Sequence, residues 1–185
     1  MVDISIDHTT MATLQSMVGK TFERYSCDPF LFTPTVIGIV GLYIGGKSYK
    51  LTSDLESVEC LFDKEDFAIM KIAPCQPNEI VTRMVDGQLI DTPVQDRIVR
   101  IDVVNDLEAL THDDERSELH STKGVVFYLA SGNEISFEIE VYFSEMITIR
   151  RGYNLVAQFT PVDDFLEGWK AGYVPDSERE VVTLD

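Results

Sequence analysis

Residues 38–46 read Gly-Ile-Val-Gly-Leu-Tyr-Ile-Gly-Gly and residues 47–51 read Lys-Ser-Tyr-Lys-Leu, and this stretch decides the fold. It consists of an apolar run of strand length, two glycines, and a short strand in which apolar and polar residues alternate. Both central residues of a type I′ turn have a positive φ, which glycine adopts without steric cost. The stretch therefore predicts a β-hairpin with its turn at Gly45-Gly46.

A similar pattern recurs in the second half of the chain. Residues 124–133 read Gly-Val-Val-Phe-Tyr-Leu-Ala-Ser-Gly-Asn, and residues 134–137 continue as a short alternating strand. Further strands are expected before and after each hairpin, at Thr21–Ser26, Phe67–Ile72, Arg97–Val104 and Glu145–Arg150. Two similar antiparallel units of about four strands each predict a mainly β (α+β) protein, in which the units pack together or close into one barrel.

Short helices are expected near both ends of the chain. Thr9 or Thr10 is a suitable N-cap for a helix that runs to about Val18. Pro161 followed by two acidic residues in the first turn is typical of a helix start and predicts a second helix over Val162–Ala171. The residues from Ser177 to the end are expected to be a frayed tail or an edge strand.

Two acidic segments and a proline-rich one are interpreted as connections. Asp54–Asp66 is expected to be an acidic connection with space for a helical turn, and Asn105–Leu119 is expected to be a loop or a poor helix. Residues 74–95 contain three prolines and the turn-forming pair Asp86-Gly87. The expected division is a first β unit over 1–76, a connecting segment over 77–95 and a second β unit over 96–185. One compact domain is the alternative.

The composition is that of a folded globular protein, with 44% hydrophobic and 25% charged residues. No stretch approaches the roughly 20 apolar residues that span a bilayer, and residues 1–7 lack the pattern of a signal peptide. Three cysteines without CxxC spacing indicate neither a disulfide framework nor a zinc site. We therefore expect a cytoplasmic location and no contact with a membrane.

The charge balance bears on partners. The chain carries 32 acidic and 15 basic residues, which gives a net charge of −17. Nucleic acids and anionic membranes require a positive surface, so direct binding to either is not expected. An acidic surface instead favours fast association with a basic protein partner.

Motifs for catalysis, cofactors or metals are lacking in the sequence. No GxGxxG, GxxxxGK[ST], HExxH, GxSxG or EF-hand pattern occurs, and the chain has only three histidines. His112 and His120 flank an acidic run, but a separation of eight residues suits neither a helix nor a strand as a metal site. We therefore predict no catalytic residues, no cofactor and no metal, and an enzyme that uses carboxylates near these histidines is the least favoured alternative.

Two binding functions remain. The first is a non-enzymatic acidic binding protein that engages a basic partner, with Asp113, Asp114, Glu115 and Glu118 as candidate contact residues. The alternative is a small-ligand-binding β domain with a cleft lined by aromatic residues. The candidate lining residues are Phe22, Tyr25, Phe30, Phe32, Tyr43, Tyr49, Phe127, Tyr128, Phe137, Tyr142 and Phe143. Phe165 and Trp169 are expected to pack the second helix against a sheet.

Overall fold

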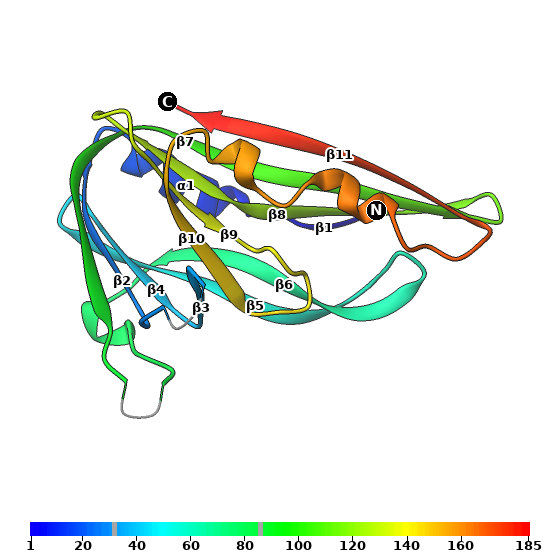
Figure 1. Ribbon diagram of the computed structural model, residues 1–185, viewed down its shortest axis with the longest axis horizontal. Helices are drawn as coiled ribbons and strands as arrows, with labels where there is room; N and C mark the ends of the chain where they lie inside the picture. Colours follow the sequence, from blue (N-terminus) through cyan, green and yellow to red (C-terminus); the bar gives the residue numbers. More distant parts are fainter. Residues whose placement is uncertain (31–32, 85–86) are drawn as a thin grey trace.

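Eleven strands form one open, mainly antiparallel sheet in the computed structural model, which describes residues 1–30, 33–84 and 87–185 (Figure 1). The mainly β prediction is confirmed. The strands are β1 (Val2–Ile4), β2 (Thr21–Cys27), β3 (Thr35–Ile37), β4 (Val40–Ile44), β5 (Lys47–Cys60), β6 (Asp63–Pro74), β7 (Ile90–His112), β8 (Glu115–Leu129), β9 (Glu134–Glu138), β10 (Met146–Gly152) and β11 (Tyr173–Leu184).

The sheet is built from two antiparallel meanders. β2, β4, β5 and β6 pair in succession, and so do β7, β8, β9 and β10, while β2 and β7 pair with each other. β11 adds antiparallel to β7, and β1 adds parallel to β8. β3 and β6 are the two ends of the strand order, so the described residues form an open sheet and not the closed barrel that was one of the expected forms.

The sheet is bent into two layers, one with β2, β4, β5 and β6 and the other with β8 and β11 (Figure 1). Strand β7 belongs to both layers. Its first residues pair with β2, and Ile98–His112 pairs with β8. Gln95 has a φ of 54°, and the pairing with β2 shifts register between Phe22 and Arg24. Such irregularities bend a strand, and in Figure 1 β7 turns from the layer of β2, β4, β5 and β6 into the layer of β8 and β11.

Both glycine-turn hairpins are present. Gly45 and Gly46 have φ values of 62° and 73°, as a type I′ turn requires, and they join β4 to β5. Gly132, with a φ of 90°, lies in the turn between β8 and β9. At the start of the second pattern, a Cβ on Gly124 would lie 2.3 Å from the carbonyl oxygen of Phe137, so only glycine allows β9 this close.

The predictions of an acidic connection at Asp54–Asp66 and of a loop or poor helix at Asn105–Leu119 are wrong. Both segments are hairpins: β5 continues into β6 through Leu61-Phe62, and β7 continues into β8 through Asp113-Asp114. All four turn residues have a positive φ, between 49° and 68°. The acidic residues occur in strands because partners distant in the sequence bind several of them, as described below.

The single α-helix of the described residues is α1 (His8–Met17). Its N-cap is Asp7, not Thr9 or Thr10, because the Asp7 side chain accepts a hydrogen bond from the Thr10 backbone N–H at 2.7 Å. The expected helix over Val162–Ala171 is wrong. Only the 3₁₀ turn η3 (Val162–Leu166) forms, and the chain then leads into β11, which pairs with β7 from Tyr173 onward.

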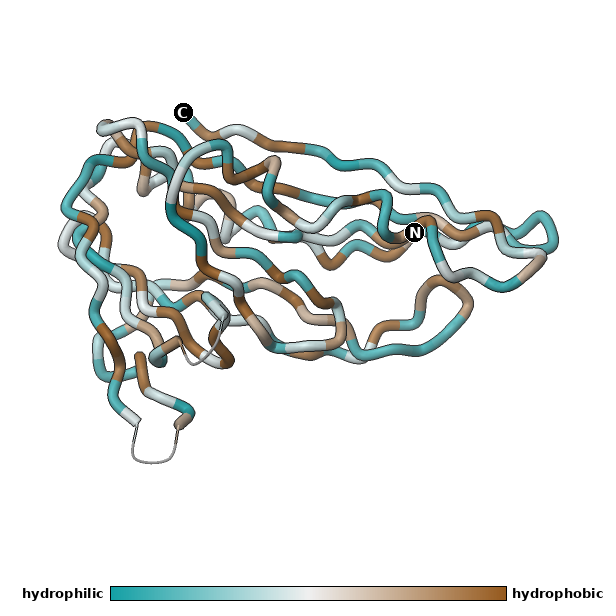
Figure 2. The backbone as a smooth tube through the Cα atoms, in the orientation of Figure 1, coloured by the Kyte–Doolittle hydropathy of each residue, from teal (hydrophilic) through white to brown (hydrophobic). Residues whose placement is uncertain are grey.

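One hydrophobic cluster takes buried side chains from both meanders and from α1. Its largest fully buried members include Phe22, Phe127, Phe137, Leu14 and Met17. Figure 2 shows that hydrophobic residues are spread along the strands of both layers, whereas the tip of the β7–β8 hairpin is hydrophilic. The expected connection 77–95 contains the 3₁₀ turn η1 (Pro77–Glu79) and the start of β7.

Phe32 and Asp86, two residues singled out from the sequence, lie outside the described residues. A third 3₁₀ turn in the described part of the chain, η2 (Val156–Gln158), precedes η3. Within the described ranges, no helix combines the length and the apolar character that a bilayer crossing requires.

Candidate functional site

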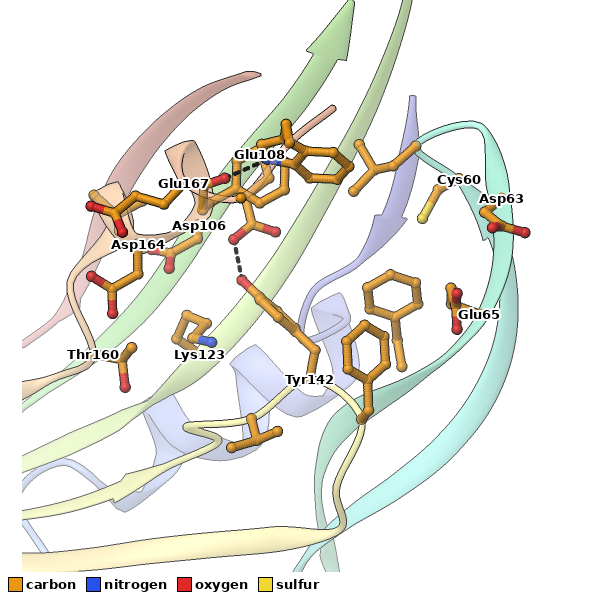
Figure 3. A pocket seen from close by; sticks show the side chains of 18 of the residues that line it. Cys60, Asp63, Glu65, Asp106, Glu108, Lys123, Tyr142, Thr160, Asp164 and Glu167 are labelled. Atoms are coloured by element: carbon orange, nitrogen blue, oxygen red, sulfur yellow. Dashed lines mark hydrogen bonds between the residues drawn. The ribbon is translucent and has the colours of Figure 1, made fainter. Parts of the chain in front are cut away.

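A cavity of about 670 Å³ lies where the β5–β6 hairpin faces the second half of β7 and β8. The loop after β9 and the segment Thr160–Lys170 close it on further sides (Figure 3). This volume lies within the roughly 300–1,000 Å³ of typical small-molecule sites. The cavity is therefore the candidate functional site.

Aromatic rings make up much of the lining. They are Phe62, Phe67, Tyr142, Phe143, Phe165, Trp169 and Tyr173. The ring of Phe67 lies 5.9 Å from that of Tyr142 and 5.7 Å from that of Phe143, measured between centroids. On the segment before β11, the rings of Phe165 and Trp169 are 5.2 Å apart. The cavity thus has aromatic groups from three separate parts of the chain: the β5–β6 hairpin, the loop after β9, and the segment that leads into β11.

A further group of aromatic contacts joins the tip of the β5–β6 hairpin to the tip of the β7–β8 hairpin and the start of β11. Phe62, in the β5–β6 turn, has its ring 6.0 Å from that of His112 and 6.2 Å from that of Tyr173. His112 and Tyr173 themselves stack at 4.2 Å. The β5–β6 turn therefore contacts the end of β7 and the start of β11 beside the cavity.

Lys123 is the buried cation of the cavity. Only 3% of its surface is exposed, and Nζ lies 3.7 Å from the centroid of the Tyr142 ring. Among the residues that the structure describes, Nζ takes part in neither a hydrogen bond nor an ion pair. Burial lowers the pKa of the Lys123 ammonium, although the nearby charge of Glu108 acts in the opposite direction.

A β-bulge places Lys123 at this position. Val104 of β7 pairs with Gly124 and Asn105 pairs with Thr122, so Lys123 is an extra residue on β8. A bulge interrupts the alternation of side chains and changes the direction of the extra residue. The apolar part of β8 ends at the bulge, and the polar wall of the cavity begins there.

Glu108 and Tyr142 form a hydrogen-bonded pair in the cavity wall. The Tyr142 hydroxyl donates to Glu108 Oε1 (Figure 3). Burial raises the pKa of Glu108, against the hydrogen bond from Tyr142, which lowers it. Burial and the charge of Glu108 raise the pKa of the Tyr142 hydroxyl well above its ordinary value.

Asp106 is held by an arginine from β11. Arg179 Nε donates to Asp106 Oδ1 at 2.7 Å, and Arg179 Nη2 donates to Oδ2 at 2.8 Å. Nη2 also donates to the carbonyl oxygen of Thr160 at 2.8 Å. The N–H of Thr160 donates to Glu138 Oε1 at 2.7 Å, and Glu138 pairs with Arg150. These contacts fix the start of the segment that carries Phe165 and Trp169.

The rim of the cavity is acidic. Its exposed carboxylates are Asp63, Glu65, Asp164 and Glu167, and Lys170 is the exposed base. Figure 3 shows Asp164 and Glu167 on one side of Tyr142, and Asp63 and Glu65 on the other. The rim is therefore acidic and open to solvent, whereas the buried wall combines Lys123 with the carboxylates of Asp106 and Glu108.

Cys60 also lines the cavity, but its chemistry is that of a core thiol. Burial raises the pKa of its thiol to about 11. The thiolate is the reactive form of cysteine, so Cys60 has little nucleophilic character at neutral pH.

The four candidate contact residues lie at the tip of the β7–β8 hairpin and do not line the cavity. Asp113 and Asp114 form the turn and are exposed, as is Glu115. Glu118 is partly buried and accepts a hydrogen bond from Arg116 Nε at 2.8 Å, and Arg116 also pairs with Asp176 at 3.1 Å.

The two histidines of that region do not meet. His120 pairs with Leu107 and His112 pairs with Glu115, so the two positions are five residues apart along β7. His112 Nδ1 lies 3.6 Å from Asp113, and His120 Nδ1 lies 3.8 Å from Asp3. Over the described ranges, no three side chains of the metal-ligand types converge on one point.

Of the aromatic residues considered from the sequence, Tyr142 and Phe143 line the cavity, whereas Phe22, Phe127 and Phe137 are in the main hydrophobic cluster. The interpretation from sequence missed five lining residues: Phe62, Phe67, Phe165, Trp169 and Tyr173. Phe62, Phe67 and Phe165 each adjoin an acidic residue in the sequence, whereas Trp169 and Tyr173 do not.

Comparisons with protein-family models, with curated proteins and with solved structures found no match to this chain. The function therefore has to be inferred from the residues of the cavity.

Proposed function

We propose that the chain is a ligand-binding β domain, and that its ligand is a small, largely apolar organic molecule held in the cavity. The observation that carries this proposal is the combination of an aromatic lining with Lys123, a buried amine without a hydrogen-bond partner among the described residues. Apolar walls with a few convergent polar groups are typical of small-molecule sites.

The aromatic lining supports an apolar ligand. Phe143 is 59% exposed and Trp169 is 38% exposed, although both lie beside other rings of the cavity. Aromatic side chains contribute large contact areas and favour the faces and edges of other rings. A flat apolar molecule would cover these surfaces and remove them from water.

The polar wall supports binding over catalysis. Arg179 occupies both carboxylate oxygens of Asp106, and Arg150 with the Thr160 N–H occupies Glu138. Lys123 is different because its ammonium lies over the ring of Tyr142 and donates no hydrogen bond to a described residue. The ring and the nearby carboxylates offset part of the cost of burying this charge, and an acceptor group on a ligand would add the missing hydrogen bond.

The test uses Trp169, the single tryptophan of the chain, as a reporter in the cavity. Titration with the neutral dye N-phenyl-1-naphthylamine should quench Trp169 fluorescence in a saturable way. Phe143→Ala should weaken binding about tenfold, which corresponds to roughly 1.4 kcal/mol. Tyr153→Ala is the matched control, because Tyr153 is 66% exposed and does not line the cavity. An unsaturable response, or equal losses in both variants, would contradict the proposal.

A second candidate function is binding of a basic protein through the β7–β8 tip. It is favoured by the three exposed acids at that tip, Asp113, Asp114 and Glu115, on a chain of net charge −17. Electrostatic association of this kind is fast and falls steeply with salt. Capture of a partner whose association rate is indifferent to salt and to Asp113→Asn with Asp114→Asn would remove this candidate.

A further inference from the structure

The buried wall of the cavity carries one cation, Lys123, beside two carboxylates, Asp106 and Glu108. The rim presents exposed carboxylates from two sides. If the cavity binds a ligand as proposed above, these charges restrict the ligand beyond its apolar character.

Lys123 Nζ lies over the ring of Tyr142 and has no hydrogen-bond acceptor among the described residues. Three nearby carboxylates favour the charged form of Lys123 and so raise its pKa: those of Glu108, Asp106 and Glu138. Each already accepts hydrogen bonds from another side chain: Glu108 from Tyr142, Asp106 from Arg179, and Glu138 from Arg150. The β-bulge nevertheless directs Lys123 into the cavity lining, where a ligand oxygen can reach it.

The acceptor on the ligand should be neutral. A ligand carboxylate beside Lys123 would also lie near Glu108 and Asp106, and like charges at short range repel strongly in a poorly solvated site. A carbonyl oxygen accepts from an ammonium without adding a negative charge. A ketone, ester or amide therefore fits the wall better than an acid.

The rim favours a positive charge. Asp164 and Glu167 lie on the same short segment as Phe165 and Trp169, whose rings are 5.2 Å apart. Indole is the best aromatic face for an organic cation, and nearby carboxylates add to the attraction. Asp63 and Glu65 extend the negative rim on the opposite hairpin.

We propose that the cavity takes an elongated organic cation with a neutral carbonyl group at the end opposite its positive charge. The carbonyl oxygen accepts a hydrogen bond from Lys123 Nζ, the apolar body lies among Phe67, Tyr142 and Phe143, and the cation lies at the rim near Trp169.

Four matched probes test this proposal by titration against Trp169 fluorescence and by calorimetry. The parent is a 4-acetylphenyl group joined through a propyl chain to trimethylammonium. The second probe replaces acetyl by ethyl, the third replaces trimethylammonium by the neutral isostere tert-butyl, and the fourth replaces it by carboxylate. We expect the parent to bind about tenfold more tightly than the second and the third, and the fourth to bind most weakly.

Two variants assign each preference to its end of the cavity. Lys123→Met should remove the preference for acetyl over ethyl and keep the preference for the cation. Asp164→Asn with Glu167→Gln should reduce the preference for the cation and its dependence on salt, and keep the preference for acetyl. Asp113→Asn with Asp114→Asn changes the charge by the same amount away from the cavity and should leave both preferences unchanged.

The outcomes separate this inference from the proposed function. Equal binding of the four probes, each saturable, would overturn the inference and leave a cavity for apolar ligands. Lys123→Met weakening all four equally would also overturn it, because Lys123 would then act only on the structure. No saturable binding of any probe, together with none of the neutral dye, would overturn both.

Discussion

The same two strands, β7 and β8, bury hydrocarbon along one part of their length and charge along the next. On one side of the bulge at Lys123 they contribute Val103 and Phe127 to the main hydrophobic cluster, and these residues are 1% and 0% exposed. On the other side β7 contributes Asp106 and Glu108, which are 1% and 3% exposed. Burial is nearly equal in the two parts, so burial alone does not decide which residues a strand accepts.

The difference lies in where the partners come from. The apolar side chains need only neighbours of suitable shape, which the facing strands provide. Each buried carboxylate needs a specific donor, and the donors come from distant parts of the chain: Arg179 of β11 for Asp106, and Tyr142 of the loop after β9 for Glu108. The charged part is therefore stable only when several segments are in place together, and it is this part that lines the cavity.

The largest expected effect tests the apolar part. Phe137→Ala removes a fully buried ring that contacts those of Tyr25 and Phe127, each with centroids 5.9 Å away. We expect the free energy of unfolding to fall by about 3–5 kcal/mol, measured by urea denaturation. Binding of the neutral dye by the folded variant should be unchanged.

Phe143→Ala is the control for Phe137→Ala, because we expect it to affect binding and not stability. Phe143 is 59% exposed and lines the cavity, so its loss should weaken dye binding and change the free energy of unfolding by under about 1 kcal/mol. If both variants lost stability and binding in the same proportion, the two parts would not be distinct in their roles.

A somewhat smaller effect tests the charged part. Arg179→Met leaves Asp106 buried without its two hydrogen bonds, and we expect a loss of about 3 kcal/mol in urea denaturation. Replacing Asp106 by Leu in the same chain should restore most of this loss, since the uncompensated charge is then gone.

Lys71→Met is the control for an exposed ion pair. Lys71 pairs with Glu56, and both side chains are 49% exposed, so we expect a loss under about 1 kcal/mol. A similar loss for Arg179→Met would show that the contact with Asp106 contributes no more than a surface pair.

These contrasts also explain what the sequence could predict. The turn at Gly45-Gly46 and the alternation of Lys47–Leu51 are local signals, and the hairpin they predict is present. The strand character of Asn105–Leu119 was missed because acidic residues are typical of solvated connections unless partners are known. The partner of Asp106 lies 73 residues away, and no local pattern indicates it.

The cavity could not be predicted from the sequence for a related reason. Its walls depend on the β5–β6 turn, where Leu61 and Phe62 have φ values of 52° and 68°. Bulky residues rarely adopt this region, so turn chemistry does not predict a turn there. The contacts of the Phe62 ring with His112 and Tyr173 accompany this conformation, and they are visible only once the two layers face each other.

The smallest expected effect concerns the pH dependence of the charged part. Glu108 faces Tyr142, Lys123, Asp106 and Arg179, and burial raises its pKa above the ordinary value of 4.5. The folded state then binds more protons than the unfolded state between the two pKa values, so the contribution of Glu108 to stability is present below about pH 4.5 and is lost as the pH rises through the folded-state pKa.

Glu108→Gln mimics the protonated side chain and does not titrate. The stability of this variant relative to the unmodified chain should therefore increase as the pH rises from 4.5 toward 7.5, measured by urea denaturation at each pH. Glu115→Gln removes the same charge from an exposed position at the β7–β8 turn and corrects for the change in net charge. A relative stability that is flat or falls with pH would mean that Glu108 is as well stabilised in its charged form as it is in water.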